Sequence, residues 1–431
     1  MIETVREIAL RTWLAKVPVT WTVQPAKRIF RITKERSFIE NPQVLSLTRS
    51  GVVERDVSGN DGQIAASYVD YASVQPGDFV LNPMDLIAGW VAVTPHPGVV
   101  SNAYITFRLK DGSDGEECEA RYFEYLFGAY YNDRILNPFG KGLGRSESGG
   151  GRWTLNADTF LNFPVPVPPI EDQRAISAFL DRRLHAIDEL IQKQVALAEK
   201  LYARRSSLIT QAVLDGALEQ KRDRRILVDW LPPLPTNWDI APLWACYRRT
   251  KKVGSPELDL LALYREHGVI KKDSRDDNHN VESEDLSSYQ VVRVGDLVVN
   301  KMKAWQGSIS LSTLEGIISP AYFVYTPLHA SNSKYFHYLL RSAPYVAHYN
   351  RISKGVRVGQ WDLDPQHFRT LPLCIPPLEE QELIVAFLDE QLKLNSLTMD
   401  KNLEIVKKLQ ERRAALISAA VMGKIDIRGE N

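Results

Sequence analysis

Cysteine is scarce in this sequence, which has three among 431 residues: Cys118, Cys246 and Cys374. Their odd number and wide separation exclude a disulfide framework and a Cys-x-x-Cys metal site, so we expect reduced thiols. None of the eight histidines has a partner at a spacing typical of metal ligands. We therefore expect no metal site in this chain.

Two short motifs of nucleotide and DNA chemistry are also missing. The sequence has no Gly-x4-Gly-Lys-[Ser/Thr] loop, whose backbone amides cradle the phosphates of nucleoside triphosphates. It also lacks the [Asp/Asn]-Pro-Pro-aromatic loop of adenine methyltransferases, because Asn82-Pro83-Met84 and Asn137-Pro138-Phe139 have no second proline. We therefore predict a non-catalytic protein that binds no cofactor itself.

Long apolar runs are absent as well. No stretch approaches the roughly 20 apolar residues that are needed to cross a bilayer as a helix. The first residues carry Glu3, Arg6, Glu7 and Arg11 in place of the apolar core of a signal peptide. We therefore expect a cytoplasmic protein.

The chain has no excess of charge of either sign, since 53 basic residues balance 53 acidic ones. Domains that bind nucleic acids are usually basic, so this balance is weak evidence against such a function. Only local clusters of basic side chains could attract a polyanion here.

What the sequence does contain is an internal repeat, the feature to look for before assigning a fold. One segment near the start of the chain recurs in the second half: WLAKVPVTW (13–21) answers WLPPLPTNW (230–238). A second block matches GDFVLNPM (77–84) with GDLVVNKM (295–302), and GVVSNAY (98–104) with GIISPAY (316–322). The strongest match pairs PVPPIEDQRAISAFLDRRL (166–184) with CIPPLEEQELIVAFLDEQL (374–392).

Three blocks in the same order indicate a duplicated chain with the order domain, helix, domain, helix. We predict target domains at 1–167 and 223–375 and long helices at 168–222 and 376–431. Both globular parts contain short β-branched runs bounded by Gly, Pro and Asn, which predicts strand-rich α+β domains. The expected helices within them cover 120–131 and 333–350.

Each helical block carries apolar residues that step alternately by four and three, which is typical of a coiled-coil seam. Prolines before each block disfavour helix at the preceding residue, so each helix should begin just after them. About 45 residues give a rod of roughly 65 Å, and two rods would pack most simply as an antiparallel coiled coil. The predicted apolar seam is Leu180, Leu184, Ile187, Ile191, Leu201, Leu208, Leu388, Leu392, Met399, Val406, Leu409 and Leu416.

Polar residues interrupt this seam at Gln194, Asn395 and Asn402, and arginines stand at Arg205 and Arg413. Polar groups at seam positions fix the register of a coiled coil at some cost in stability. We expect these five residues either to set the register or to face a partner protein.

Two glycine-rich basic segments, 137–153 and 353–361, are predicted to be loops near the end of each globular domain. Glycines let backbone amides approach a phosphate, while basic side chains supply charge. A solvated loop without a ligand is an equally good interpretation. The candidate DNA contacts in these loops are Lys141, Arg145, Arg152, Lys354 and Arg357.

The segment NKMKAWQG (300–307) adds three further candidates, Lys301, Lys303 and Trp305. If it is a strand, these residues share one face by the two-residue period. A row of basic and aromatic groups would suit a nucleic-acid surface, although a tryptophan in such a place more often packs inside the domain.

These motifs together resemble the specificity subunits of type I restriction-modification systems. The resemblance rests on Trp-Leu-x2-[Val/Leu]-Pro-x2-Trp, Gly-Asp-x3-Asn-x-Met, Gly-x2-Ser-x-Ala-Tyr and Pro-Pro-x-Glu-x-Gln, each present twice. It extends over the chain from about residue 13. The first copy departs from the pattern with NPMDLIAG (82–89) in place of NKMKAWQG, which puts a basic and aromatic row there in doubt.

The resemblance implies that each globular domain is a target recognition domain that enters the major groove over one part of a bipartite, asymmetric sequence. The long helices would separate the two domains and dock two modification (methyltransferase) subunits. Two restriction subunits would complete the assembly. S-adenosylmethionine, ATP and Mg²⁺ are then expected on those partner subunits and not on this chain.

Two other functions remain open from the residues alone. One is a structural coiled-coil scaffold without DNA affinity, for which two large duplicated domains are unnecessary. The other is a self-contained restriction-methylation enzyme, against which the two missing motifs speak. The sequence identifies neither the bases recognised nor the length of the spacer between them.

Overall fold

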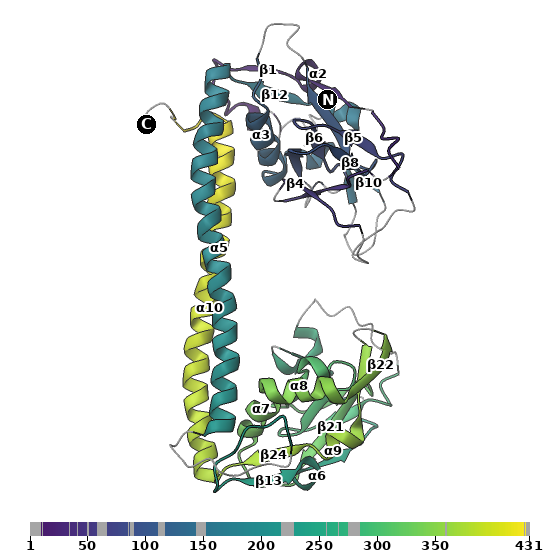
Figure 1. Ribbon diagram of the computed structural model, residues 1–431, viewed down its shortest axis with the longest axis vertical. Coiled ribbons are helices and arrows are strands. Elements are labelled where there is room, and N and C mark those ends of the chain that lie inside the picture. Colours follow the sequence, from purple (N-terminus) through teal and green to yellow (C-terminus); the bar gives the residue numbers. More distant parts are fainter. Residues whose placement is uncertain are drawn as a thin grey trace. The chain divides into compact units, whose positions relative to one another are not determined.

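The computed structural model describes residues 10, 12–33, 35–40, 42–49, 51–57, 67–84, 86, 90–110, 117–143, 152–216, 228–255, 257–265, 267–274, 285–357, 360–425 and 427. The chain divides into two compact units, one formed by Met1–Gln194 with Glu404–Asn431 and the other by Val195–Leu403. Each unit contains one strand-rich globular domain and part of each long helix (Figure 1).

The globular domain of the first unit is built on a four-stranded antiparallel sheet in the order β2-β9-β6-β7, and α3 packs against β7. Two-stranded antiparallel ladders accompany it: β1-β12, β3-β4, β5-β8 and β10-β11. Its strands are β1 (Thr22–Pro25), β2 (Phe30–Ile32), β3 (Leu45–Thr48), β4 (Gly51–Glu54), β5 (Ala72–Val74), β6 (Phe79–Leu81), β7 (Val91–Val93), β8 (Gly98–Val100), β9 (Ile105–Leu109), β10 (Lys141–Leu143), β11 (Arg152–Thr154) and β12 (Pro164–Val167). Its helices are α2 (Ala26–Ile29), α3 (Ala120–Asn132), η1 (Asn137–Phe139) and α4 (Ala157–Leu161).

The second globular domain repeats this topology, with the four-stranded sheet β14-β21-β18-β19 and the ladders β13-β24, β15-β16, β17-β20 and β22-β23. Its strands are β13 (Asp239–Pro242), β14 (Tyr247–Thr250), β15 (Leu261–Tyr264), β16 (Gly268–Lys271), β17 (Gln290–Val292), β18 (Leu297–Asn300), β19 (Ile309–Leu311), β20 (Gly316–Ile318), β21 (Tyr322–Pro327), β22 (Ser353–Arg357), β23 (Gln360–Leu363) and β24 (Pro372–Ile375). Its helices are α6 (Leu243–Cys246), η2 (Lys272–Ser274), η3 (Ala304–Gln306), α7 (Ser333–Arg341), α8 (Ala343–Ile352) and α9 (Pro365–Arg369). The predicted α+β class and internal two-fold repeat are confirmed.

Aromatic side chains fill the core of the first domain. Phe30 of β2, Phe79 of β6 and Phe107 of β9 are buried against one another, with ring centroids 4.9–5.4 Å apart. Phe123 and Phe127 of α3 cover them from the helix side. Burying each such ring contributes about 1.5–3 kcal/mol, so this cluster is what holds α3 on the sheet.

The duplicated Gly-Asp motif forms a turn before a buried strand. Gly77 and Gly295 adopt φ of 92° and 90°, a conformation that favours glycine. The following aspartates accept a backbone N–H within the turn, Asp78 from Gln75 and Asp296 from Arg293. The motif therefore shapes the entry into β6 and β18.

Both long helices begin directly after their prolines, as predicted. α5 spans Ile170–Asp215 and α10 spans Leu378–Val421. Acidic residues in both first turns suit the positive end of the helix dipole. The glutamine of the duplicated motif secures each start, because Gln173 Nε2 donates to the Pro168 carbonyl and Gln381 Nε2 to that of Pro376, both at 2.8 Å.

The two long helices pack together, and their pairing is antiparallel (Figure 1). In the first unit Arg413 Nε donates to Asp188 Oδ1 at 2.8 Å. In the second unit Asn395 Nδ2 donates to the Leu201 carbonyl at 3.2 Å, so higher numbers on α5 meet lower numbers on α10. Every predicted apolar seam residue is buried or half-buried, and Asn395 and Asn402 are buried among them.

The helix expected over 333–350 is divided in two at Ser342, which has φ −67° and ψ 152°. Pro344 explains the break, since it lacks an N–H and is accepted only in the first turn of a helix. α7 and α8 are therefore separate elements.

Candidate nucleic-acid interface

The described parts of the first glycine-rich segment at 141–143 and 152–153 form paired strands. β10 pairs with β11 so that Lys141 lies opposite Thr154 and Leu143 opposite Arg152. The loop prediction for these two stretches is therefore wrong. Strand pairing gives their backbone N–H and C=O groups hydrogen-bond partners that an open loop would find only in water. Arg145 lies outside the described residues, as do the side chains of Lys141 and Arg152.

The second glycine-rich segment forms the equivalent hairpin. β22 pairs with β23, placing Lys354 opposite Asp362 and Arg357 opposite Gln360, with a bulge between the two basic residues. The loop prediction is corrected here too. The side chain of Lys354 is exposed, and that of Arg357 lies outside the described residues.

The strand expected over 300–307 is wrong. β18 ends at Asn300, and a turn followed by η3 takes its place. The Asn300 side chain accepts the Met302 N–H at 3.1 Å and Gly307 closes η3 with φ 85°, so local hydrogen bonds outweigh the two-residue alternation. Lys301, Lys303 and Trp305 therefore do not form one row.

Lys301 is half-buried and held by local contacts. Its Nζ donates to the Pro320 carbonyl at 2.5 Å and lies 4.9 Å from the centre of the Phe323 ring. Burial, together with nearby Arg249 and Lys251, lowers the pKa of Lys301 below its usual value. Lys303, in contrast, is exposed.

Trp305 connects η3 to the second hairpin. Its indole Nε1 donates to the Met302 carbonyl at 3.0 Å, and its ring lies 4.9 Å from that of Trp361 in β23. The Leu363 N–H also donates to the Lys301 carbonyl at 2.9 Å. The structure thus brings the 300–307 segment against the hairpin that carries Lys354 and Arg357.

Each four-stranded sheet also carries a basic run on its edge strand, which the sequence-based prediction of the site missed. In the second domain it covers RRTKK (248–252), where Arg248, Arg249, Lys251 and Lys252 are exposed. Arg249 lies 4.2 Å from the Phe323 ring, close to Lys301. The equivalent run of the first domain is RITKER (31–36), beginning on β2. The signal that could have found both is the clustering of charge at matching positions of the repeat.

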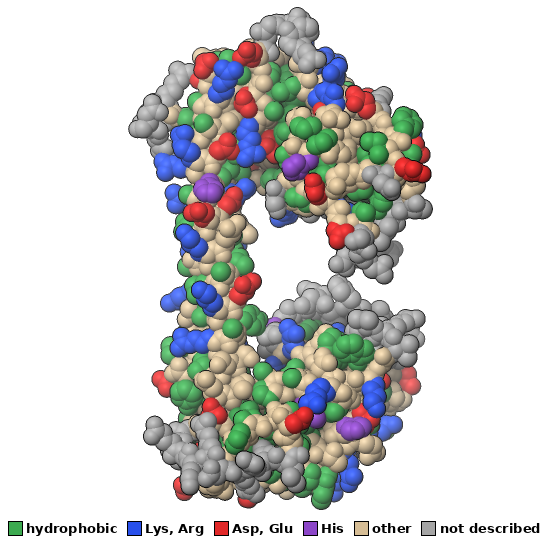
Figure 2. Space-filling model, viewed as in Figure 1, with side chains coloured by type: hydrophobic (Ala, Val, Ile, Leu, Met, Phe, Trp, Pro, Cys, Tyr) green, Lys and Arg blue, Asp and Glu red, His purple; other side chains and the backbone are tan. Residues whose placement is uncertain are grey.

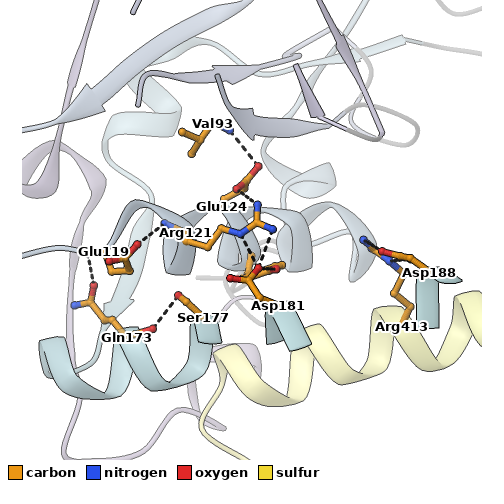
Figure 3. A network of polar contacts seen from close by, with 10 residues as sticks. Val93, Glu119, Arg121, Glu124, Gln173, Ser177, Asp181, Asp188 and Arg413 are labelled. Carbon is orange, nitrogen blue, oxygen red and sulfur yellow. Dashed lines mark hydrogen bonds and ion pairs between the residues drawn. The ribbon is translucent and has the colours of Figure 1, made fainter. Parts of the chain in front are cut away.

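A polar network fastens the first globular domain to α5 (Figure 3). The Glu119 N–H donates to Gln173 Oε1 at 2.9 Å, and Arg121 pairs with Asp181 at 2.9 Å and Glu124 at 2.6 Å. Tyr125 donates to the same Asp181, and burial followed by this hydrogen bond raises the pKa of Tyr125. These contacts fix α3 to the helix.

The second domain is fastened to α10 by the same design. The Asn332 N–H donates to Gln381 Oε1 at 2.9 Å. Lys334 Nζ and the Tyr338 hydroxyl both bind Asp389 at 2.6 Å. Each domain is therefore held on one long helix through a backbone amide, a basic residue and a tyrosine, so a surface on the domain has a defined orientation on that helix.

Residues 18–199 and 278–407 match the family model described as the type I restriction modification DNA specificity domain. The chain belongs to this family. The predicted resemblance to type I specificity subunits is thereby confirmed. No curated protein matches the chain significantly.

Solved structures of type I systems are similar to this family member, and one of them shares its fold. One, described as the structural basis of complex assembly and conformational transition of the type I R-M system, has a TM-score of 0.65 at 15% identity and covers 95% of this chain and 99% of its own. The HsdS subunit from Thermoanaerobacter tengcongensis gives 0.46 at 17% identity, covering 95% and 98%. The S subunit from M. genitalium gives 0.35 at 12% identity, covering 94% and 98%.

Within the described residues of this specificity-family chain, no helix is both long and apolar enough to span a membrane, and no group of His, Cys, Asp and Glu is placed to hold a metal ion. Basic and acidic side chains are interspersed on the face drawn in Figure 2, consistent with the balanced composition.

Proposed function

We propose that this specificity subunit recognises a bipartite, asymmetric DNA sequence, one part with each globular domain, and that the long helices set the distance between the two parts. The observation that carries the proposal is the duplicated fastening of one domain to α5 and of the other to α10. A rigidly held domain can keep its base contacts in register. Direct recognition of all four base pairs requires the major groove.

We assign the DNA-facing surface of each domain to its hairpin and its basic edge strand. In the second domain this surface combines exposed Lys354, Lys303 and the 248–252 run. Such groups favour phosphate contacts, which orient a protein on the duplex. Glycine has no side chain to keep the backbone away from a phosphate, so the hairpin glycines suit phosphate contact more than rigid contact with a base edge.

The partners of this role are two modification subunits and two restriction subunits. Apolar side chains exposed on the long helices support a docking role, since such surfaces in soluble proteins usually mark interaction sites. They include Leu190, Val195, Leu197, Leu383, Phe387, Leu394 and Leu397. In this proposal the chain itself is non-catalytic and works in the cytoplasm, and S-adenosylmethionine, ATP and Mg²⁺ bind to the partners.

The test is to incubate this chain, with and without its modification subunits, with labelled S-adenosylmethionine and DNA, and then to map the methylated adenines. We expect methyl transfer only with the partners, at a two-part sequence. Transfer by the lone chain would establish a self-contained enzyme, and partner-dependent transfer at sites unaffected by exchanging residues 20–165 for those of a relative would refute DNA recognition by the first domain.

The lone chain provides a second test. A net charge of zero supplies little counterion release, and the exposed apolar helix faces lack their partners. We therefore expect weak binding or poor solubility of the isolated chain and a gain of both properties with the modification subunits. Tight, sequence-specific binding by the monomeric chain in a salt titration contradicts this expectation.

A further inference from the structure

A pocket of about 740 Å³ lies in the second unit, between α5, α7 and the strands β16 and β19. Small-molecule sites commonly measure about 300–1,000 Å³. Four cationic residues line it, Arg205, Arg265, Lys334 and Arg341, and His337 and Tyr338 lie among them. Its remaining wall includes apolar groups such as Ile209 and small residues such as Gly268.

The corresponding part of the first unit carries different residues from those that line the pocket. The Glu119 and Asn332 amides make the same contact in the two units, which aligns α3 with α7. In this register His337 replaces Glu124 and Arg341 replaces Gly128. The contacts agree, since Glu124 accepts the Val93 N–H at 3.2 Å and His337 Nδ1 accepts the Leu311 N–H at 3.5 Å.

A second carboxylate has been lost on the long helices. The repeat register places Arg205 at the position of Arg413, and Ser396 at the position of Asp188. Arg413 forms an ion pair with Asp188 at 2.8 Å. No described residue accepts a hydrogen bond from Arg205 or forms an ion pair with it.

The electrostatic balance of the pocket is therefore positive. Relative to the first unit, two carboxylates are replaced by uncharged groups and one guanidinium is added, while Asp389 is engaged by Lys334 and Tyr338. Burial, followed by Arg341, Lys334 and Arg205, lowers the pKa of His337 to about 3, so its ring is neutral at neutral pH. Arg341 donates to the carbonyls of Ile309 and Arg265, which holds its guanidinium in place.

We propose that this pocket binds a phosphate-bearing small molecule of nucleotide size, with Arg205 as the main phosphate contact. A guanidinium presents donors in a planar fork that matches phosphate oxygens. Tyr202 and Ile209 of α5 and Val269 of β16 supply apolar surface for the rest of such a ligand. The volume of the pocket matches a small molecule, whereas the backbone phosphate of a duplex, which has the same chemistry, needs only a surface contact. This site does not depend on the DNA recognition proposed above, so either can fail alone.

The test measures the binding of AMP, inorganic phosphate and a duplex oligonucleotide of unrelated sequence to the full chain with its modification subunits, by calorimetry at physiological ionic strength. We expect AMP to bind more tightly than inorganic phosphate. Arg205→Ala should lower the affinity for AMP at least tenfold. Arg204→Ala, which removes the same charge from a neighbouring exposed residue that does not line the pocket, should change it less than twofold.

Ser396→Asp is the decisive second variant. It restores to Arg205 the acidic partner that Arg413 has, so it should abolish AMP binding without lowering thermal stability. Equal affinity of the wild type, Arg205→Ala and Ser396→Asp overturns the proposal, as does the failure of the wild type to bind AMP. Loss of affinity confined to the duplex oligonucleotide assigns the pocket to DNA phosphate and overturns the small-molecule ligand.

Discussion

α3 of the first unit and α7 of the second make the same contacts with their long helices, yet the residues around those contacts carry different charges. The amides of Glu119 and Asn332 bind matching glutamines, and Asp181 and Asp389 each bind a basic residue and a tyrosine. One turn further along, Glu124 in the first unit is His337 in the second. Duplication has thus kept the residues that hold a domain on its helix and changed those beside them.

Elsewhere, too, the two domains share the residues that shape the fold and differ in the residues on their surfaces. Both domains keep their turn glycines, Gly77 and Gly295, and both contain a two-stranded hairpin near their ends. The sequences of the hairpins differ, as do those of the edge strands. If each domain recognises its own half-site, as proposed, a constant frame with variable surfaces is what selection for asymmetric specificity would produce.

The largest difference in stability between the two units should come from two equivalent tryptophans. Trp238 is fully buried and donates to Glu380 at 3.1 Å, whereas Trp21 is only half-buried. Trp238→Ala should therefore destabilise its unit by about 3–5 kcal/mol, and Trp21→Ala by about 1–2 kcal/mol. Hydrogen exchange followed separately in peptides of each unit measures both. Equal losses would show that the two heads of the repeat are not packed differently.

The next effect concerns acid stability. The unfolded chain protonates His337 near pH 6.5 but the folded chain only near pH 3, so between these values the unfolded state binds more protons. The contribution of His337 is therefore fully favourable above pH 6.5 and falls by up to about 1.4 kcal/mol per pH unit below it.

His337→Gln removes this titration while it keeps an acceptor for the Leu311 N–H. The second unit should then unfold at a lower pH, with the first unit unchanged. Acid unfolding curves of the two units compare them directly, and an unaltered curve for the second unit refutes the role of His337.

The smallest effect tests the hairpin of the second domain. Lys354→Ala and Arg357→Ala in the assembled complex should weaken binding to all DNA sequences about equally and lower the salt slope by about one per lost phosphate contact. Lys200→Ala, on the exposed face of α5, serves as the control. A loss at a single base pair, by roughly 1–3 kcal/mol, would instead assign Arg357 to a guanine edge. Unchanged DNA affinity in both variants would show that the hairpin does not contact DNA and serves only the structure of its domain.

Local and periodic signals made much of the fold predictable. Pro169 and Pro377 mark the helix starts because proline restricts the residue before it, and the seam residues follow the heptad period. The repeat predicted that the two domains contain the same helices and strands.

Pairing at a distance could not be predicted in the same way. The 137–153 and 353–361 segments contain enough glycine to suggest loops, and only the ladder partners in the structure identify them as hairpins. At Lys301 to Trp305 an alternating pattern predicted a strand. In the structure the Asn300 side chain accepts the Met302 N–H instead, and the backbone forms a turn. The predicted DNA contacts themselves remain predictions.

In the proposed function the domains determine the half-sites and the helices determine the spacer. Deleting one heptad from each helix, residues 192–198 of α5 and 400–406 of α10, keeps the antiparallel register set by Arg413 with Asp188 and Asn395 with Leu201. Seven residues shorten the helices by about 10 Å, close to the length of three base pairs.

The measurement is a genome-wide map of methylated adenines in cells that carry the shortened chain and its partners, beside the same map for the intact chain. We expect two unchanged half-sites separated by a shorter spacer. Changed bases in either half-site with the original spacer would contradict it.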